Sequence, residues 1–246
     1  NAVMGAGYAA GPVGLALVGT DGWLPFLIAI SAFCLCASVL ALVARGLDGF
    51  ESDGETAMGV GGFARLAPAL LLAVIVSAAA QQSTYSLMPV FGAAYGLAEA
   101  MLAALVTALS VGNIVLQIPL GLMAERAGAR TMIVACAFAT GSCALLLPVL
   151  ISTPAIWPVL VVMGGVGYGV YTMALVELGE RFSGSTLVAG NAAFALMWGA
   201  GGIVGPPTAG VLMQAIGPLG LPVVIAGLSA ILIVSVILRS AYRARS

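Results

Sequence analysis

The sequence has no histidine and few charged residues, and both absences restrict what the protein can do. Without histidine, a His-bearing zinc site, an HExxH protease and a Ser-His-Asp triad cannot be built. Most carboxylates lie near the ends of apolar runs, so their placement does not predict hydrolytic chemistry. A formal net charge of −1 gives no electrostatic basis for binding nucleic acid. We therefore expect no enzymatic activity, no metal, no cofactor and no nucleic-acid partner.

Charged residues are also too few to cover a soluble domain. Eight basic and nine acidic residues are spread over 246 positions, 62% of the residues are hydrophobic, and the mean hydropathy is +1.17. An ordinary soluble domain carries about 25% charged residues. The solvent of this chain is therefore lipid, where backbone groups must be satisfied inside helices or closed barrels. Because unbroken apolar stretches of about 20 residues recur and no alternating strand pattern appears, the sequence predicts an all-α integral membrane protein.

Charged or Gly/Pro-rich breaks divide the chain into apolar segments long enough to cross a membrane. We expect eight such spans, at about 2–19, 24–44, 66–92, 98–122, 131–151, 156–178, 187–214 and 219–239. The four cysteines lie inside these segments, where cysteine behaves as a small hydrophobic residue. Residues 45–65 contain six charged side chains among glycines and predict a polar loop between the second and third spans.

The arginines predict the orientation of the chain. If the spans alternate in direction, all the arginines fall on one side of the membrane: Arg45, Arg65, Arg126, Arg130, Arg181, Arg239, Arg243 and Arg245. The opposite loops contain Asp21 and Glu99 but no arginine. Positive charge in short loops is retained on the cytoplasmic side of a membrane. We therefore expect a cytoplasmic carboxyl terminus.

A glycine-proline pattern occurs twice, as Gly5-Ala6-Gly7-Tyr8-Ala9-Ala10-Gly11-Pro12 and as Gly199-Ala200-Gly201-Gly202-Ile203-Val204-Gly205-Pro206. The two copies are 194 residues apart, and one apolar span follows each. At about 30 residues per span and loop, this offset corresponds to six helices and predicts two six-helix halves. We expect 1–44 to hold the last two helices of the first half, 45–65 to be the cytoplasmic loop between the halves, and 66–246 to be the second half with a short cytoplasmic tail. About four N-terminal helices of the same protein would then be missing before Asn1.

Two motifs resemble signatures of the major facilitator superfamily. Gly-x-x-x-Gly-Pro, in the penultimate helix of each half, is similar to motif C of that family and is carried by Gly7, Gly11, Pro12, Gly201, Gly205 and Pro206. The loop segment Gly121-Leu122-Met123-Ala124-Glu125-Arg126-Ala127-Gly128-Ala129-Arg130 is similar to motif A, with Glu125 in place of the usual Asp and Ala129 in place of an Arg. Further segments resemble the uncharacterised bacterial YcaD-type members: 116–121, Tyr171 with Ala174, 180–181, 187–191, 205–206 and 212–214.

This resemblance implies a twelve-helix fold, of which the chain holds the fifth to twelfth helices, in a bacterial plasma (inner) membrane. It also implies roles for both motifs. Motif C would let helices pack closely and bend, although small-residue packing is common in membranes in general. Motif A, with Gly121, Glu125, Arg126, Gly128 and Arg130, would form a cytoplasmic charge latch that closes in one conformation and opens in the other. The alternative for motif A is a loop that only follows the distribution of positive charge.

Polar side chains within the apolar spans are candidates for a substrate cavity, because such groups are costly in lipid. The richest cluster runs from Gln81 to Tyr85, and these two residues share one helix face by their spacing of four. Further pairs on single faces are Asn113 with Gln117, and Tyr168 with Tyr171 and Thr172. For each group the alternative is an interhelical hydrogen bond that only holds the helices together.

No carboxylate of the sequence is expected at mid-membrane depth. Glu177 comes nearest, about one turn from the cytoplasmic end of its span, where a salt-bridged helix end is the simpler interpretation. A proton-coupled carrier needs a buried titratable group, which would then lie in the missing N-terminal helices. From the resemblance we expect a secondary transporter of a small organic solute working by alternating access, with protons as the coupling ion and efflux as the direction. The alternatives are a non-transporting membrane scaffold or sensor with the same fold, and an intramembrane enzyme, for which the sequence offers no catalytic constellation.

Overall fold

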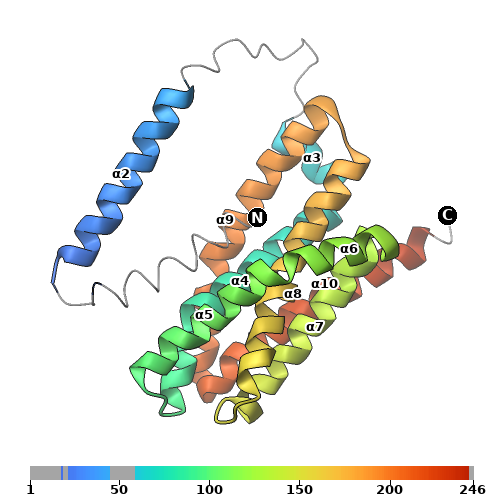
Figure 1. Cartoon of the computed structure of the whole chain (residues 1–246). Helices are drawn as coiled ribbons and strands as arrows, with labels where there is room; N and C mark the ends of the chain where they lie inside the picture. Colours follow the sequence, from blue (N-terminus) through green and yellow to red (C-terminus); the bar gives the residue numbers. More distant parts are fainter. Residues whose placement is uncertain (1–17, 19–21, 45–58, 244–246) are drawn as a thin grey trace.

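The computed structural model describes Val18 and residues 22–44 and 59–243, and no strand occurs among them. The helices, drawn in Figure 1, are α2 (Leu24–Ala44), α3 (Val60–Leu66), α4 (Pro68–Ala94), α5 (Glu99–Val115), α6 (Gln117–Ala127), α7 (Ala129–Leu150), α8 (Ile156–Arg181), α9 (Gly184–Ile216) and α10 (Gly220–Arg243), with the 3-10 turn η2 (Gly217–Leu219) between the last two. The prediction of an all-α protein is confirmed.

The expected spans correspond to helices wherever the structure describes the chain. Five helical stretches are long and apolar enough to cross a membrane, and the bent pair α5 and α6 makes a sixth if it is one span. The last stretch, Gly184–Leu238, contains both α9 and α10. Gly217, at φ 75°, ends α9, and α10 then packs back against it. The expected span at 2–19 falls almost entirely outside the described residues.

The span expected at 98–122 is broken. Helices α5 and α6 meet at Leu116 with a bend of 45°. Pro119 lies one turn into α6 and has no backbone N–H, so the carbonyl of Val115 loses its helical partner. Hydrogen bonds continue on both sides, from Leu116 N to Gly112 O at 3.0 Å and from Leu120 N to Leu116 O at 3.0 Å. The span therefore bends at this point while its hydrogen-bond ladder resumes.

The seven helices from α4 to α10 form one bundle, in which helices that follow one another in sequence are not always neighbours (Figure 1). Helix α4 packs mainly against α9, and α5 packs against α8; α7 lies between α8 and α10, and α10 also contacts α4. The contact between α5 and α8 is made backbone to backbone. A Cβ on Gly112 would overlap the carbonyl of Val161, and one on Gly164 would overlap the carbonyl of Leu109. Glycine at both positions is what permits this close approach.

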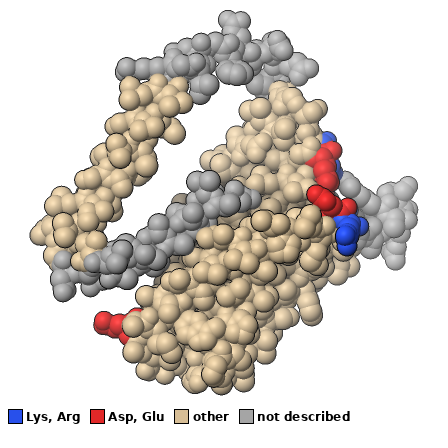
Figure 2. Space-filling view, viewed as in Figure 1, with Lys and Arg blue, Asp and Glu red and all other residues tan. Residues whose placement is uncertain are grey.

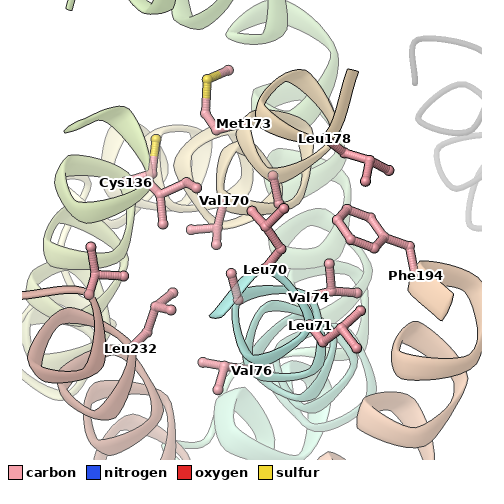
Figure 3. Close-up of a cluster of buried hydrophobic side chains, with 14 of the residues drawn as sticks. Leu70, Leu71, Val74, Val76, Cys136, Val170, Met173, Leu178, Phe194 and Leu232 are labelled. Carbon is pink, nitrogen blue, oxygen red and sulfur yellow. The ribbon is translucent and has the colours of Figure 1, made fainter. Parts of the chain in front are cut away.

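The bundle contains two buried apolar clusters, one toward each end. Figure 3 shows part of the first, where side chains from α4, α7, α8, α9 and α10 point toward one another; they include Leu70, Val74, Cys136, Val170, Phe194 and Leu232. The second cluster includes Met88, Phe91, Leu105, Leu147, Leu160 and Leu221. Many large apolar side chains on the outer faces are exposed, among them Ile118, Phe138, Val149 and Ile203. An apolar exterior around an apolar core is what a lipid solvent requires.

Helix α3 lies within the region expected as a polar loop, so the sequence did not predict it. Its Phe63 is fully buried and meets Phe182 edge to face, with ring centroids 5.3 Å apart. A Cβ on Gly190 of α9 would lie 3.0 Å from the Phe63 ring. These contacts fix α3 to the ends of α8 and α9. Helix α2, by contrast, lies apart from the bundle in Figure 1, and none of its described side chains is buried.

Candidate functional site

Ser83 and Thr84, in the polar stretch of α4, are buried, and their hydroxyl groups bond to their own helix. Ser83 Oγ donates to Ala79 O at 2.6 Å, and Thr84 Oγ1 donates to Ala80 O at 2.7 Å. Both side chains are thereby satisfied four residues back, as is common for Ser and Thr inside helices. The Ser83 and Thr84 hydroxyl groups are therefore bonded to the backbone of α4.

The structure brings Gln81 and Tyr85 to one small cavity inside the bundle. The cavity has a volume of about 10 Å³, enough for about one water molecule, and is lined by Ala80, Gln81, Thr84, Tyr85, Leu109, Thr140, Met163, Gly164 and Gly167. Gln81 is only 8% exposed, and a Cβ on Gly167 would lie 3.4 Å from its Nε2 atom. The expected shared face of Gln81 and Tyr85 thus points toward α5, α7 and α8, into the interior of the bundle.

A hydrogen-bonded chain crosses the break between α5 and α6. Gln117 Nε2 donates to Asn113 Oδ1 at 3.0 Å, and Thr172 Oγ1 of α8 donates to Gln117 Oε1 at 2.9 Å. Asn113 is 2% exposed, whereas Gln117 and Thr172 are half-buried. The amide of Gln117 therefore links both halves of the bent span to α8 and is partly accessible from outside the bundle.

Aromatic rings lie on the same stretch of α8. Tyr171 contacts Trp198 of α9 with ring centroids 4.6 Å apart, and Tyr168 meets Tyr171 at 5.6 Å and Trp198 at 5.7 Å. Tyr168 is buried, and Tyr171 and Trp198 are half-buried. Such pairs stabilise a contact by about 0.5–1.5 kcal/mol beyond the area they bury.

Trp198 is the residue of this group that sequence reasoning missed. It lies near the middle of the 33-residue α9, far from either end. Tryptophan in membrane helices concentrates at the two membrane interfaces, so one at mid-depth is unusual. That position is the signal that could have identified it.

The predicted cavity residues thus fall into two groups. Gln81 and Tyr85 line the interior cavity, while Asn113, Gln117, Tyr168 and Tyr171 belong to the α5–α6, α8 and α9 side of the bundle. The four residues of the second group do not line the cavity that contains Gln81 and Tyr85. No described side chain with a formal charge contributes to either group, and no cluster of three His, Cys, Asp or Glu residues occurs in the described chain.

The motif A residues surround Gly128, whose backbone conformation requires glycine. Gly128 joins α6 to α7 at φ 81° and ψ 144°, a conformation essentially reserved for glycine, and its N–H bonds to Ala124 O. Glu125 and Arg126 are exposed, and Arg130 and Gly121 are half-buried. Neither arginine pairs with a carboxylate among the described residues. The motif A residues therefore lie together where α6 meets α7.

Glu177 forms an ion pair with Arg181, four residues on, at 2.8 Å. Both line a pocket of about 30 Å³ with Arg130, the first residues of α4 and Val236 of α10. Figure 2 shows acidic and basic side chains gathered at this end of the bundle, and a separate acidic patch at the opposite end. Arg65, Arg126 and Arg181 lie in the last turns of α3, α6 and α8, and Arg130 lies in the first turn of α7. Glu99 begins α5 at the other end of the bundle.

Gly201 and Gly205 of the second glycine-proline motif face α4. A Cβ on Gly201 would overlap Ile75 O, and one on Gly205 would overlap Ala79 O. Pro206 follows within α9 and is half-buried. The residues of the first copy, Gly7, Gly11 and Pro12, lie outside the described part of the chain.

The chain is similar to known membrane proteins. The family model of the Major Facilitator Superfamily matches residues 70–245. Proteins named "Uncharacterized MFS-type transporter YcaD", from Salmonella paratyphi B (strain ATCC BAA-1250 / SPB7), Salmonella newport (strain SL254) and Salmonella heidelberg (strain SL476), are each 30% identical to the chain over 142 residues. Those residues make up 57% of this chain and 36% of each relative, so the match covers little more than a third of the relatives' length. No solved structure gives a significant match.

Proposed function

The chain belongs to the major facilitator superfamily, as its two motifs predicted, and on that premise we propose that it is part of a secondary transporter that moves a small organic solute by alternating access. The observation that carries the proposal is the Asn113, Gln117 and Thr172 hydrogen-bonded chain at the break of a bent span. Interrupted helices with polar groups at mid-membrane depth are typical of transporter binding sites.

Within this proposal, the solute meets the half-buried members of the group. Gln117 offers an amide, Thr172 a hydroxyl, and Tyr171 and Trp198 offer aromatic faces. Asn113 and Tyr168 are buried behind them and hold them in position. Gln81 and Tyr85 line the cavity inside the bundle and support α8 from its other side, next to Gly167.

Alternating access requires a turn at which helices can change their angle and close contacts along which helices can slide. Gly128 supplies the turn between α6 and α7, and Glu125, Arg126 and Arg130 next to it act as the cytoplasmic latch, with Gly121 on α6. Gly201, Gly205 and Pro206 form the close contact of α9 with α4. Gly7, Gly11 and Pro12 would play the same part in the other half.

Coupling and orientation complete the proposal. The nearest described carboxylate, Glu177, is already paired with Arg181 at the end of its helix. We therefore assign proton coupling to a titratable group in the N-terminal helices that would complete the first half, and efflux to the direction of transport. The charged end of the bundle faces the cytoplasm of a bacterial inner membrane, and the carboxyl terminus lies on the same side.

Transport in proteoliposomes tests this function. The full-length product of the gene that encodes this chain is reconstituted, a pH gradient is imposed, and a chemically diverse panel of solutes is added while lumenal pH and solute content are followed. Solute movement that dissipates the gradient is the expected result, and Gln117→Ala and Tyr171→Ala should lower the rate. Solute movement that does not depend on the pH gradient would contradict proton coupling but not transport. No movement by protein shown to be folded would favour a non-transporting scaffold or sensor.

A further inference from the structure

An apolar groove runs along the outside of the bundle between α7 and α10. It has a volume of about 540 Å³ and is lined by Arg130, Thr131, Val134, Ala135, Phe138, Ile233, Val236 and Ile237. This volume is within the range of roughly 300–1,000 Å³ found for small-molecule sites. Figure 1 shows α7 and α10 side by side, and most of the lining side chains are exposed or half-buried. The groove therefore opens toward the lipid.

Arg130 lies at one end of this groove and carries a positive charge, whereas the other described residues that line it are uncharged. It is the second residue of α7, whose remaining 20 positions are uncharged, so its guanidinium lies where the helix enters the membrane. From Thr131 to Phe138 the groove follows α7 for about 10 Å toward the membrane interior, at about 1.5 Å per residue. The positively charged Arg130 is thus followed directly by the apolar part of the groove.

Two further observations indicate that an anion would be favoured at Arg130. First, Arg130 forms no ion pair with a carboxylate in the described part of the chain, and the nearby Glu177 is bound to Arg181. Second, Gly128 caps α7 without a side-chain hydrogen bond, and the first turn of α7 contains no acidic residue, so no carboxylate in that turn offsets the positive end of the helix dipole. Basic positions between membrane helices on the cytoplasmic side commonly bind anionic lipid head groups.

We propose that the α7–α10 groove binds an anionic phospholipid of the adjacent leaflet, with one acyl chain along Val134, Ala135 and Phe138 and the phosphate on Arg130. The apolar groove explains why a chain-bearing ligand is preferred to a free anion. The guanidinium binds the phosphate through a planar fork of donors. A head group with net negative charge is preferred to a zwitterionic one because it brings no cationic group close to the arginine. Arg130 is also a residue of the proposed latch, but lipid occupancy is measured without any solute, so the lipid site can be tested separately from transport.

The test compares lipids that differ only in the head group. The full-length gene product is purified in detergent and incubated with equal amounts of phosphatidylglycerol and phosphatidylcholine carrying identical acyl chains, and native mass spectrometry measures how much of each is retained. Arg130→Gln removes the charge and Ala135→Trp fills the groove. The matched controls are Arg126→Gln, at the same end of the bundle but outside the groove, and Val149→Trp, exposed on α7 but outside the groove.

We expect the unmodified protein to retain phosphatidylglycerol preferentially. Arg130→Gln should lower the ratio of the two lipids about fivefold, the factor expected of one arginine near a membrane surface, while Arg126→Gln should leave it unchanged. Ala135→Trp should lower retention of both lipids, and Val149→Trp should not. Arg130→Lys, which keeps the charge, should retain most of the preference and provides a measurement if Arg130→Gln does not fold.

Three results would overturn the proposal. Equal retention of both lipids by the unmodified protein would show that the groove does not select the head group. An equal loss of preference in Arg126→Gln and Arg130→Gln would show a diffuse surface effect. Displacement of phosphatidylglycerol by millimolar inorganic phosphate would show that Arg130 is a site for free anions and that the groove contributes nothing.

Discussion

Gln117 Nε2 lies 3.0 Å from Asn113 Oδ1, and the two side chains lie on opposite sides of the 45° bend between α5 and α6. The hydrogen bond therefore joins the two halves of one broken span. Since Gln117 also accepts from Thr172 of α8, a single amide connects three helices. Bent spans need such connections, because a break in the backbone ladder leaves polar groups to be satisfied by neighbouring side chains.

Gln117→Ala should destabilise the protein and weaken transport together. The change leaves the buried Asn113 side chain without this partner, which costs about 1–3 kcal/mol. We expect a lower thermal midpoint in detergent and a higher KM for the transported solute. Thr107→Ala is the matched control, because the Thr107 hydroxyl bonds only to Ala103 O of its own helix. Equal effects of the two changes would contradict the bridging role of Gln117.

Gly205→Ala should disrupt the contact between α9 and α4. A Cβ at this position would overlap the Ala79 carbonyl, and overpacking of this kind costs about 1–3 kcal/mol. Gly210→Ala, on the same helix, meets no atom within 4 Å and should stabilise α9 by about 0.5–1 kcal/mol. Thermal unfolding of both variants measures the difference. A similar midpoint for the two would show that α9 and α4 do not pack as closely as described.

Gly128→Ala should strain the turn between α6 and α7. Its φ of 81° costs a non-glycine residue about 1–3 kcal/mol. Gly179→Ala, on α8 and outside both motifs, is the control: an added Cβ there meets no atom within 4 Å, so the change should be neutral or stabilising. We expect only Gly128→Ala to slow transport, measured as the initial rate in proteoliposomes. Slow transport by Gly179→Ala with normal transport by Gly128→Ala would contradict the assignment.

Tyr171 and Trp198 should be energetically coupled. Their rings are 4.6 Å apart, and such pairs contribute about 0.5–1.5 kcal/mol in double-mutant cycles. The single variants Tyr171→Leu and Trp198→Leu and the double variant are compared by thermal unfolding and by solute KM. Tyr171→Phe keeps the ring and should keep most of the affinity. Strictly additive effects on both readouts would mean that the two rings act separately.

Gln81→Leu distinguishes an interior role for Gln81 from a contact with solute. Leucine has a similar size, and apolar replacement of a buried polar side chain can be close to neutral for stability. We therefore expect the KM to remain within about a factor of two and the thermal midpoint to change little. Gln82→Leu, at the neighbouring position that faces Gly202 of α9, is the control. A tenfold or greater rise in KM for Gln81→Leu alone would place Gln81 in direct contact with the solute.

The sequence predicted the helices where apolar runs end at charged or glycine-rich breaks, as for α2 at Leu24–Ala44 and α7 at Ala129–Leu150. It missed the bend at Leu116, because the apolar run continues through it and only Pro119 marks the change. It missed α3, because that helix owes its burial to contacts of Phe63 with α8 and α9 rather than to its own pattern. Local composition carries no information on such tertiary contacts.

The sequence predicted which residues of the candidate site share a helix face, but it did not predict how these faces are placed in the bundle. Spacing by four correctly grouped Gln81 with Tyr85 and Asn113 with Gln117, because the helix period decides which residues share a face. Whether a face points into the bundle or outward depends on which helices pack together, and this is why Gln81 and Gln117 could not be told apart from the sequence. Roles for these residues in transport stay predictions.

The packing of α3 against the bundle shortens the segment that joins α2 to the bundle. Because Phe63 fixes α3 to the ends of α8 and α9, the segment that connects α2 to the bundle covers residues 45–59 rather than 45–65. At about 3.5 Å per residue, its fifteen residues reach no farther than about 50 Å. If α2 belongs to the first half, this segment limits how far the halves can separate during a transport cycle, and lengthening it at Gly59 would relax that limit without changing the bundle.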